Sequence, residues 1–134
     1  TSSVGPVAGQ LSHVQLWNPA VSGKNVFVES YSMSSTVAQS IQIGDYNAEY
    51  GTAGNAVMPK YGGSAVGVGV MRVTTNAGTL TTNGGPAFYV NANTPQVVNF
   101  REPYLIVPGR GLTVFGNTAN AWLSANFEWY EQAP

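Results

Sequence analysis

The stretch 121–130 alternates apolar and polar side chains, and this period of two limits the fold more than any other feature of the sequence. Alternation of this kind is typical of a β-strand with one buried face and one solvent-facing face. The buried face is expected to hold Leu123, Ala125, Phe127 and Trp129. The outer face is expected to hold Ser124, Asn126 and Glu128, together with the aromatic residues Trp122 and Tyr130. Large aromatic side chains on an outer face predict a partner surface there.

Strand-like segments recur about every ten to fourteen residues, with glycines and prolines between them. The candidates are 13–17, 25–33, 36–46, 65–74, 87–91, 96–100, 104–107, 112–117 and the C-terminal stretch. We therefore expect an all-β fold, an antiparallel β-sandwich of about eight to ten strands without helices. A jelly-roll-like order is favoured, because a long loop such as 47–64 can join the two sheets. An immunoglobulin-like sandwich is the alternative.

The length of 134 residues fits a single domain. Residues 1–10 are small and polar, and we expect them to form an extended N-terminal arm that docks on a neighbouring subunit. Residues 11–134 then make up the sandwich domain. Within 65–74, Gly67 and Gly69 fall opposite three valines, which predicts close approach of another backbone or an aromatic ring.

Alternation in 25–33 makes a specific prediction about side-chain placement. It puts Val26 and Val28 on one face of the strand, and Phe27, Glu29 and Tyr31 on the other.

Composition narrows the classes of partner. Charged residues make up only 8% of the chain, whereas Asn, Ser and Thr number 12, 11 and 11. The five cations are scattered, so the basic footprint of a nucleic-acid-binding protein is missing from the sequence. No apolar run approaches the roughly 18 residues of a membrane span, and we expect neither nucleic acid nor membrane as a partner. A neutral surface suits a subunit packed among others or one that faces an uncharged ligand such as a sugar.

Few residues are suited to catalysis. His13 is the only histidine, and we interpret it as a packing or surface residue, because no Gly-x-Ser-x-Gly turn accompanies it and Asp45. Glu128, flanked by aromatic residues, fits a sugar platform, a glycosidase carboxylate, or an edge charge that discourages strand pairing. Asp45, Asn47 and Glu49 alternate but lack the dense loop of a calcium motif. We predict no catalytic residues, no metal site and no cofactor.

Three tyrosines bracket the long loop, and they have two interpretations. Tyr46, Tyr50 and Tyr61 form either an adaptable contact surface or anchors that hold the loop down. The predicted interface comprises these tyrosines together with Trp122, Glu128 and Tyr130.

Segments at both ends resemble the β-sandwich domains of structural proteins of tailed-bacteriophage virions. His-Val-Gln-Leu-Trp-Asn-Pro-Ala-Val-Ser-Gly-Lys at 13–24 is similar to their opening strand and turn. The stretch 104–114, with its Pro-Gly turn, is similar to a late strand pair, and 119–129 resembles a closing strand. None of these motifs carries catalytic residues. The resemblance implies a virion component, commonly a homotrimer: a decoration or cement protein, a head fibre or a tail-associated domain.

Two functions follow as hypotheses. The first is a non-enzymatic decoration or cement protein of the virion, which binds the major capsid protein and covers or bridges capsomers through neutral interfaces. The alternative is a carbohydrate- or receptor-binding module of a phage fibre or tail, with a glycan receptor as partner.

Overall fold

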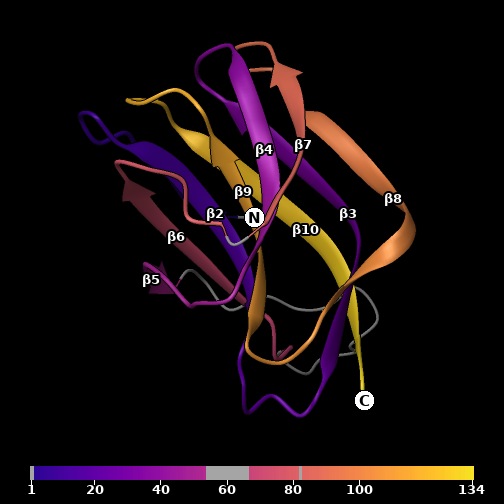
Figure 1. Ribbon diagram of the computed structural model, residues 1–134. Helices are drawn as coiled ribbons and strands as arrows, with labels where there is room; N and C mark the ends of the chain where they lie inside the picture. The colour runs from indigo at the N-terminus through magenta and orange to yellow at the C-terminus, as the bar shows by residue number, and fades with distance from the viewer. Residues whose placement is uncertain (1, 54–66, 82) are drawn as a thin grey trace.

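A computed structural model describes residues 2–53, 67–81 and 83–134. Every regular element in these ranges is a β-strand, and the strands form two antiparallel sheets packed face to face (Figure 1). The predicted all-β sandwich is therefore confirmed.

The described part of the chain contains ten strands. They are β1 (Ser2–Val4), β2 (Leu11–Asn18), β3 (Asn25–Ser35), β4 (Gln39–Tyr46), β5 (Thr52–Ala53), β6 (Val70–Asn76), β7 (Asn83–Val90), β8 (Gln96–Ile106), β9 (Arg110–Gly116) and β10 (Leu123–Gln132). The four-stranded sheet has the order β1-β10-β3-β8, and the six-stranded sheet has the order β5-β6-β2-β9-β4-β7.

Eight of these strands have jelly-roll connectivity. When β5 and β6 are set aside and the other eight are counted along the chain, the sheets read 1-8-3-6 and 2-7-4-5. This is the double-sheet arrangement of a jelly roll, in which the chain crosses between the sheets at most connections. β5 and β6 are inserted between β4 and β7 and extend the six-stranded sheet beyond β2. The jelly-roll-like prediction agrees with this order. Most of the expected loop 47–64 lies outside the described residues, and Thr52–Ala53 within it forms β5.

The beginning of the chain differs from the expected arm. Ser2–Val4 forms the first jelly-roll strand and pairs with β10 of the same chain, with Val4 opposite Leu123. Val4 is buried in the core. Residues 2–4 therefore dock on their own domain rather than on a neighbour. Three residues are too few for a recognisable alternation, and only the free edge of β10 makes them a strand.

The core lies between the sheets and follows the predicted alternation of β10. The four predicted inward residues of β10 are buried, and β2, β4 and β9 contribute Val14, Leu16, Ile41, Ile43, Leu112 and Val114 from the opposite sheet. Gly69, just before β6, confirms the predicted close approach, because a Cβ there would lie 3.3 Å from Cε2 of the Trp129 indole.

The predicted placement of Tyr31 is wrong. Its side chain is only 1% exposed and lies on the core side with Val28. Val28 and Ser30 pair with two consecutive residues of β10, so Glu29 is an extra residue in a β-bulge. A bulge shifts every later side chain by one position, and strict alternation cannot anticipate it.

Candidate functional site

The three β10-side residues of the predicted interface lie on the outer face of the four-stranded sheet. Trp122, directly before β10, is 47% exposed, Glu128 is exposed and Tyr130 is half-buried. From Trp122 to Glu128 the distance along an extended strand is about 20 Å. The structure brings these residues onto one face but not into one cluster.

Two of them make contacts within this face. The Tyr130 ring stacks on Phe27 with centroids 5.0 Å apart and an angle of 6° between the planes. The carboxylate of Glu128 accepts a hydrogen bond from the Ser30 hydroxyl at 3.0 Å. One face of the Tyr130 ring is thus already occupied by its neighbour.

The tyrosines of the long loop are placed differently. The Tyr50 ring is tilted by 50° against the ring of Tyr46 with centroids 5.7 Å apart, and its hydroxyl donates to Oγ1 of Thr113 at 3.3 Å. Burial raises the pKa of Tyr50 well above its ordinary range. Tyr50 therefore has the position of an internal anchor. Tyr61 lies outside the described residues.

His13 is a fully buried packing residue. Its ring stacks on Phe115 at 5.6 Å, Nδ1 donates to the carbonyl of Leu11 at 3.1 Å, and Nε2 accepts the N–H of Leu80 at 3.2 Å. Burial lowers the pKa of His13, which keeps the imidazole neutral. Because both ring nitrogens are engaged within the core, the ring is poorly placed to act as a general base.

The carboxylates around the predicted loop are paired with arginines. Arg110 donates to both oxygens of Asp45, and Nη2 of Arg72 lies 2.7 Å from Oε1 of Glu49. Among the described residues, no group of three or more His, Cys, Asp or Glu side chains is arranged to hold a metal ion.

Beside Asp45, a cleft of about 310 Å³ opens between the sheets along β7. Its walls are mostly apolar and include Ile43, Phe100, Tyr104 and Leu112. Burial, and then the negative charge of Asp45, raise the pKa of Tyr104. Apart from Asp45, the cleft has no charged lining residue within the described ranges, and it brings no nucleophile together with a base.

A groove lies on the outer face of the four-stranded sheet, and we call it the Trp122 groove. It consists of two adjoining hollows of about 380 and 230 Å³ that share Ser34, Pro95 and Ser124. Its walls also include Trp122 and Thr36 at one end and Ser32 and Asn126 at the other. No charged residue lines either hollow in the described part of the chain.

The position of Trp122 is fixed by its neighbours. Its backbone N–H donates to Oγ1 of Thr36 at 3.2 Å, and its carbonyl accepts the N–H of Thr36 at 3.3 Å. The backbone of Gly5 packs against the indole, since a Cβ there would lie 3.3 Å from Cζ2. The backbone of Trp122 is therefore held by Thr36, and its exposed ring packs against Gly5.

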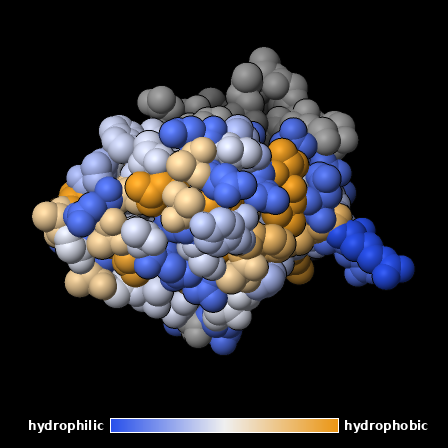
Figure 2. All heavy atoms as spheres, turned by 90° about the horizontal axis from the view of Figure 1, so that it is seen from above, coloured by the Kyte–Doolittle hydropathy of each residue, from blue (hydrophilic) through white to orange (hydrophobic). Residues whose placement is uncertain are grey.

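Exposed apolar side chains gather on β7, β8 and the turn after β8, which we call the β7–β8 edge. Tyr89 and Val97 are 67% and 63% exposed, and Leu105 and Val107 are also exposed. Even the inward-facing Phe88, Val98, Phe100 and Tyr104 are only half-buried. Figure 2, the view from above, shows apolar residues in orange among polar residues in blue on this face of the molecule. The sandwich is incompletely covered along the β7–β8 edge.

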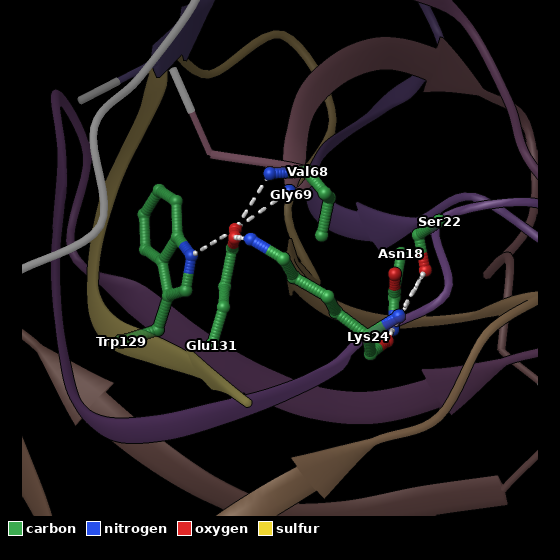
Figure 3. A network of polar contacts seen from close by, with 7 residues as sticks. All are labelled: Asn18, Ser22, Lys24, Val68, Gly69, Trp129 and Glu131. Atoms are coloured by element: carbon green, nitrogen blue, oxygen red, sulfur yellow. Dashed lines mark hydrogen bonds and ion pairs between the residues drawn. The ribbon is translucent and has the colours of Figure 1, made fainter. Parts of the chain in front are cut away.

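Glu131 has a structural role that the sequence interpretation missed. Its side chain is 4% exposed, and Oε1 accepts N–H groups from Val68 at 2.7 Å, Gly69 at 3.0 Å and the Trp129 indole at 3.2 Å (Figure 3). Lys24 Nζ lies 3.7 Å from Oε2. The alternation of β10 could have predicted this role, because residue 131 lies on the same inward face of the strand as residue 129.

In comparisons with protein-family models, curated proteins and solved structures, no match to this chain was found. Within the ranges that the structure describes, no helix has the length and apolar character needed to cross a membrane.

Proposed function

We propose that this protein is a non-enzymatic structural protein of a tailed-bacteriophage virion, of the decoration or cement type. The phage assignment rests on the sequence resemblance of segments 13–24, 104–114 and 119–129. The assembly role is supported by one structural observation, the exposed β7–β8 edge.

The β7–β8 edge has the properties of a surface that is covered in an assembly. β8 is the edge strand of the four-stranded sheet and β7 is the edge strand of the six-stranded sheet, on the same side of the sandwich. Both strands are largely exposed on both faces. A strand with little burial on either face contributes little to the stability of an isolated subunit. Burial of its apolar side chains against another subunit is favourable by about 25 cal/mol per Å².

Few charges oppose such burial. Between positions 83 and 106 the only charged residues are Arg101 and Glu102, and both are exposed. Because few ions must leave water, an interface along this edge has a small desolvation penalty. The small penalty favours packing of this edge against a second copy of the chain or against a neutral virion protein such as a major capsid protein. The homotrimer is what the sequence resemblance implies.

The test is the copy number of this chain in purified phage particles, measured by quantitative mass spectrometry against the major capsid protein. A decoration protein is expected in a fixed ratio to the capsid protein. A few copies per particle would instead place it in the tail, and its absence from particles would overturn the proposal. Light scattering of the purified chain is expected to give a trimer.

The alternative, a carbohydrate-binding module, has support of its own from the Trp122 groove.

A further inference from the structure

We propose that the Trp122 groove binds an uncharged oligosaccharide. This inference is independent of the proposed virion role, since it rests on the groove alone. The first argument is charge. The described lining residues are all uncharged, so the groove offers no counter-charge to a phosphate, a carboxylate or an ammonium group. A neutral ligand loses no ionic hydration on entering it.

The second argument is the supply of hydroxyl groups. The side chains of Ser32, Ser34 and Ser124 line the groove, and they have no hydrogen-bond partner among the described residues. Each hydroxyl can both donate and accept, so it matches either role of a sugar hydroxyl. In the free protein these hydroxyl groups form hydrogen bonds with water. A polyhydroxylated ligand can displace that water and form equivalent hydrogen bonds with the serines.

The third argument is the aromatic platform. The Trp122 ring is half-exposed, and its backbone is tied to Thr36 while Gly5 packs against the ring. Among the described residues its indole N–H has no acceptor. A fixed tryptophan gives a large contact area with little loss of conformational entropy on binding.

The length of the groove favours a chain of sugars over a single one. Trp122, directly before β10, and Ser124 and Asn126 within it line the groove at every second position, so in extended chain they are about 6.6 Å apart. The row spans about 13 Å in total. A single sugar ring cannot contact both ends of such a row at once.

The inference can be tested by tryptophan fluorescence of the full chain titrated with maltohexaose, cellohexaose and N-acetylchitohexaose. Trp17 and Trp129 are buried, so a change in emission reports Trp122. At least one neutral hexasaccharide is expected to give a saturable change that is equal at low and high salt. Hexagalacturonate, an anionic probe of the same length, is expected to give none. Failure of all three neutral probes at millimolar concentration, or equal binding of hexagalacturonate, would overturn the inference.

Variants locate the binding site. Calorimetry is expected to show that Trp122→Ala lowers the affinity for the active hexasaccharide roughly tenfold or more. Ser34→Ala keeps the indole and is expected to lower the affinity by less. Val21→Ala is the control, because it removes an exposed apolar side chain that lies outside the groove and outside β7 and β8. Unchanged affinity in Trp122→Ala would overturn the inference. So would an oligomer that dissociates on this substitution, because the groove would then be a subunit interface. Absence from virions with sugar binding intact would overturn only the proposed function.

Discussion

The indole N–H of Trp129 donates to the carboxylate of Glu131 at 3.2 Å, although the two residues belong to the same strand and the same inward face. The strand thus ends its run of core residues with an acid. That acid is satisfied by backbone N–H groups from before β6 and by Lys24 across the sandwich end (Figure 3). The carboxylate connects the last strand to the segment that enters β6.

Glu131→Ala is expected to lower the free energy of unfolding by about 3 kcal/mol, because three N–H donors lose a buried, charged acceptor. Urea denaturation followed by circular dichroism measures the change. Glu102→Ala removes an exposed carboxylate and is expected to change stability by less than about 0.5 kcal/mol. Equal effects of the two substitutions would contradict the structural role of Glu131.

Gly69→Ala is expected to destabilise the fold by about 1–2 kcal/mol, because the added Cβ would lie 3.2 Å from Cδ1 of Leu16 and 3.3 Å from the Trp129 indole. Gly84→Ala is the matched control. No described atom lies within 4 Å of its added Cβ, and its stability is expected to stay equal or rise by about 0.5 kcal/mol. Thermal and urea unfolding of both variants tests this contrast, and a neutral Gly69→Ala would argue against the tight contact.

Stability should depend on pH through His13. Burial lowers the pKa of His13 in the folded state below its ordinary value of 6.5. As pH falls below about 6.5, the unfolded chain takes up a proton that the folded chain does not. Stability is therefore lost as pH falls, with a slope from this residue of at most about 1.4 kcal/mol per pH unit, until the folded-state pKa is reached.

Two measurements check the pH dependence. Because His13 is the only histidine, its imidazole resonances in a pH titration by NMR are unambiguous. In His13→Gln the additional slope of unfolding free energy against pH should vanish, whatever the absolute stability of that variant. A midpoint at or above 6.5 in the folded protein would show that the ring is not buried as described.

Val97→Lys is expected to weaken self-association without lowering the melting temperature, because Val97 is 63% exposed on the β7–β8 edge. Val7→Lys places the same charge at a position that is 44% exposed between β1 and β2, and β1 lies at the opposite end of the four-stranded sheet from β8. Light scattering should show a smaller assembly for the first variant only. Dissociation by Val7→Lys alone would move the interface to another part of the surface.

The sequence was sufficient to predict the sandwich, because most strands alternate without interruption. The inward and outward faces of β10, and the close approach at Gly69, are as expected. The failures occur where pairing partners decide the local structure. Segments 96–100 and 104–107 were expected to be separate strands, but they form one strand, β8, since both pair with β3 on either side of a break in register.

The candidate site was predictable only in part. Alternation placed Trp122 on the outer face, and the structure agrees. The groove, however, also needs Thr36 from the end of β3 and Pro95 from before β8, which are distant from Trp122 in sequence. Only the jelly-roll topology brings these residues together, and no local pattern encodes it.

The bulge at Glu29 has a consequence for comparisons between related chains. Val28 pairs with Trp129 and Ser30 pairs with Glu128, so the residue between them could be deleted while every other side chain of β3 kept its face. Length variation is ordinarily confined to loops because a deletion inside a strand inverts all that follows. In an alignment of homologues of this protein, a gap in the middle of a strand is therefore expected at this position.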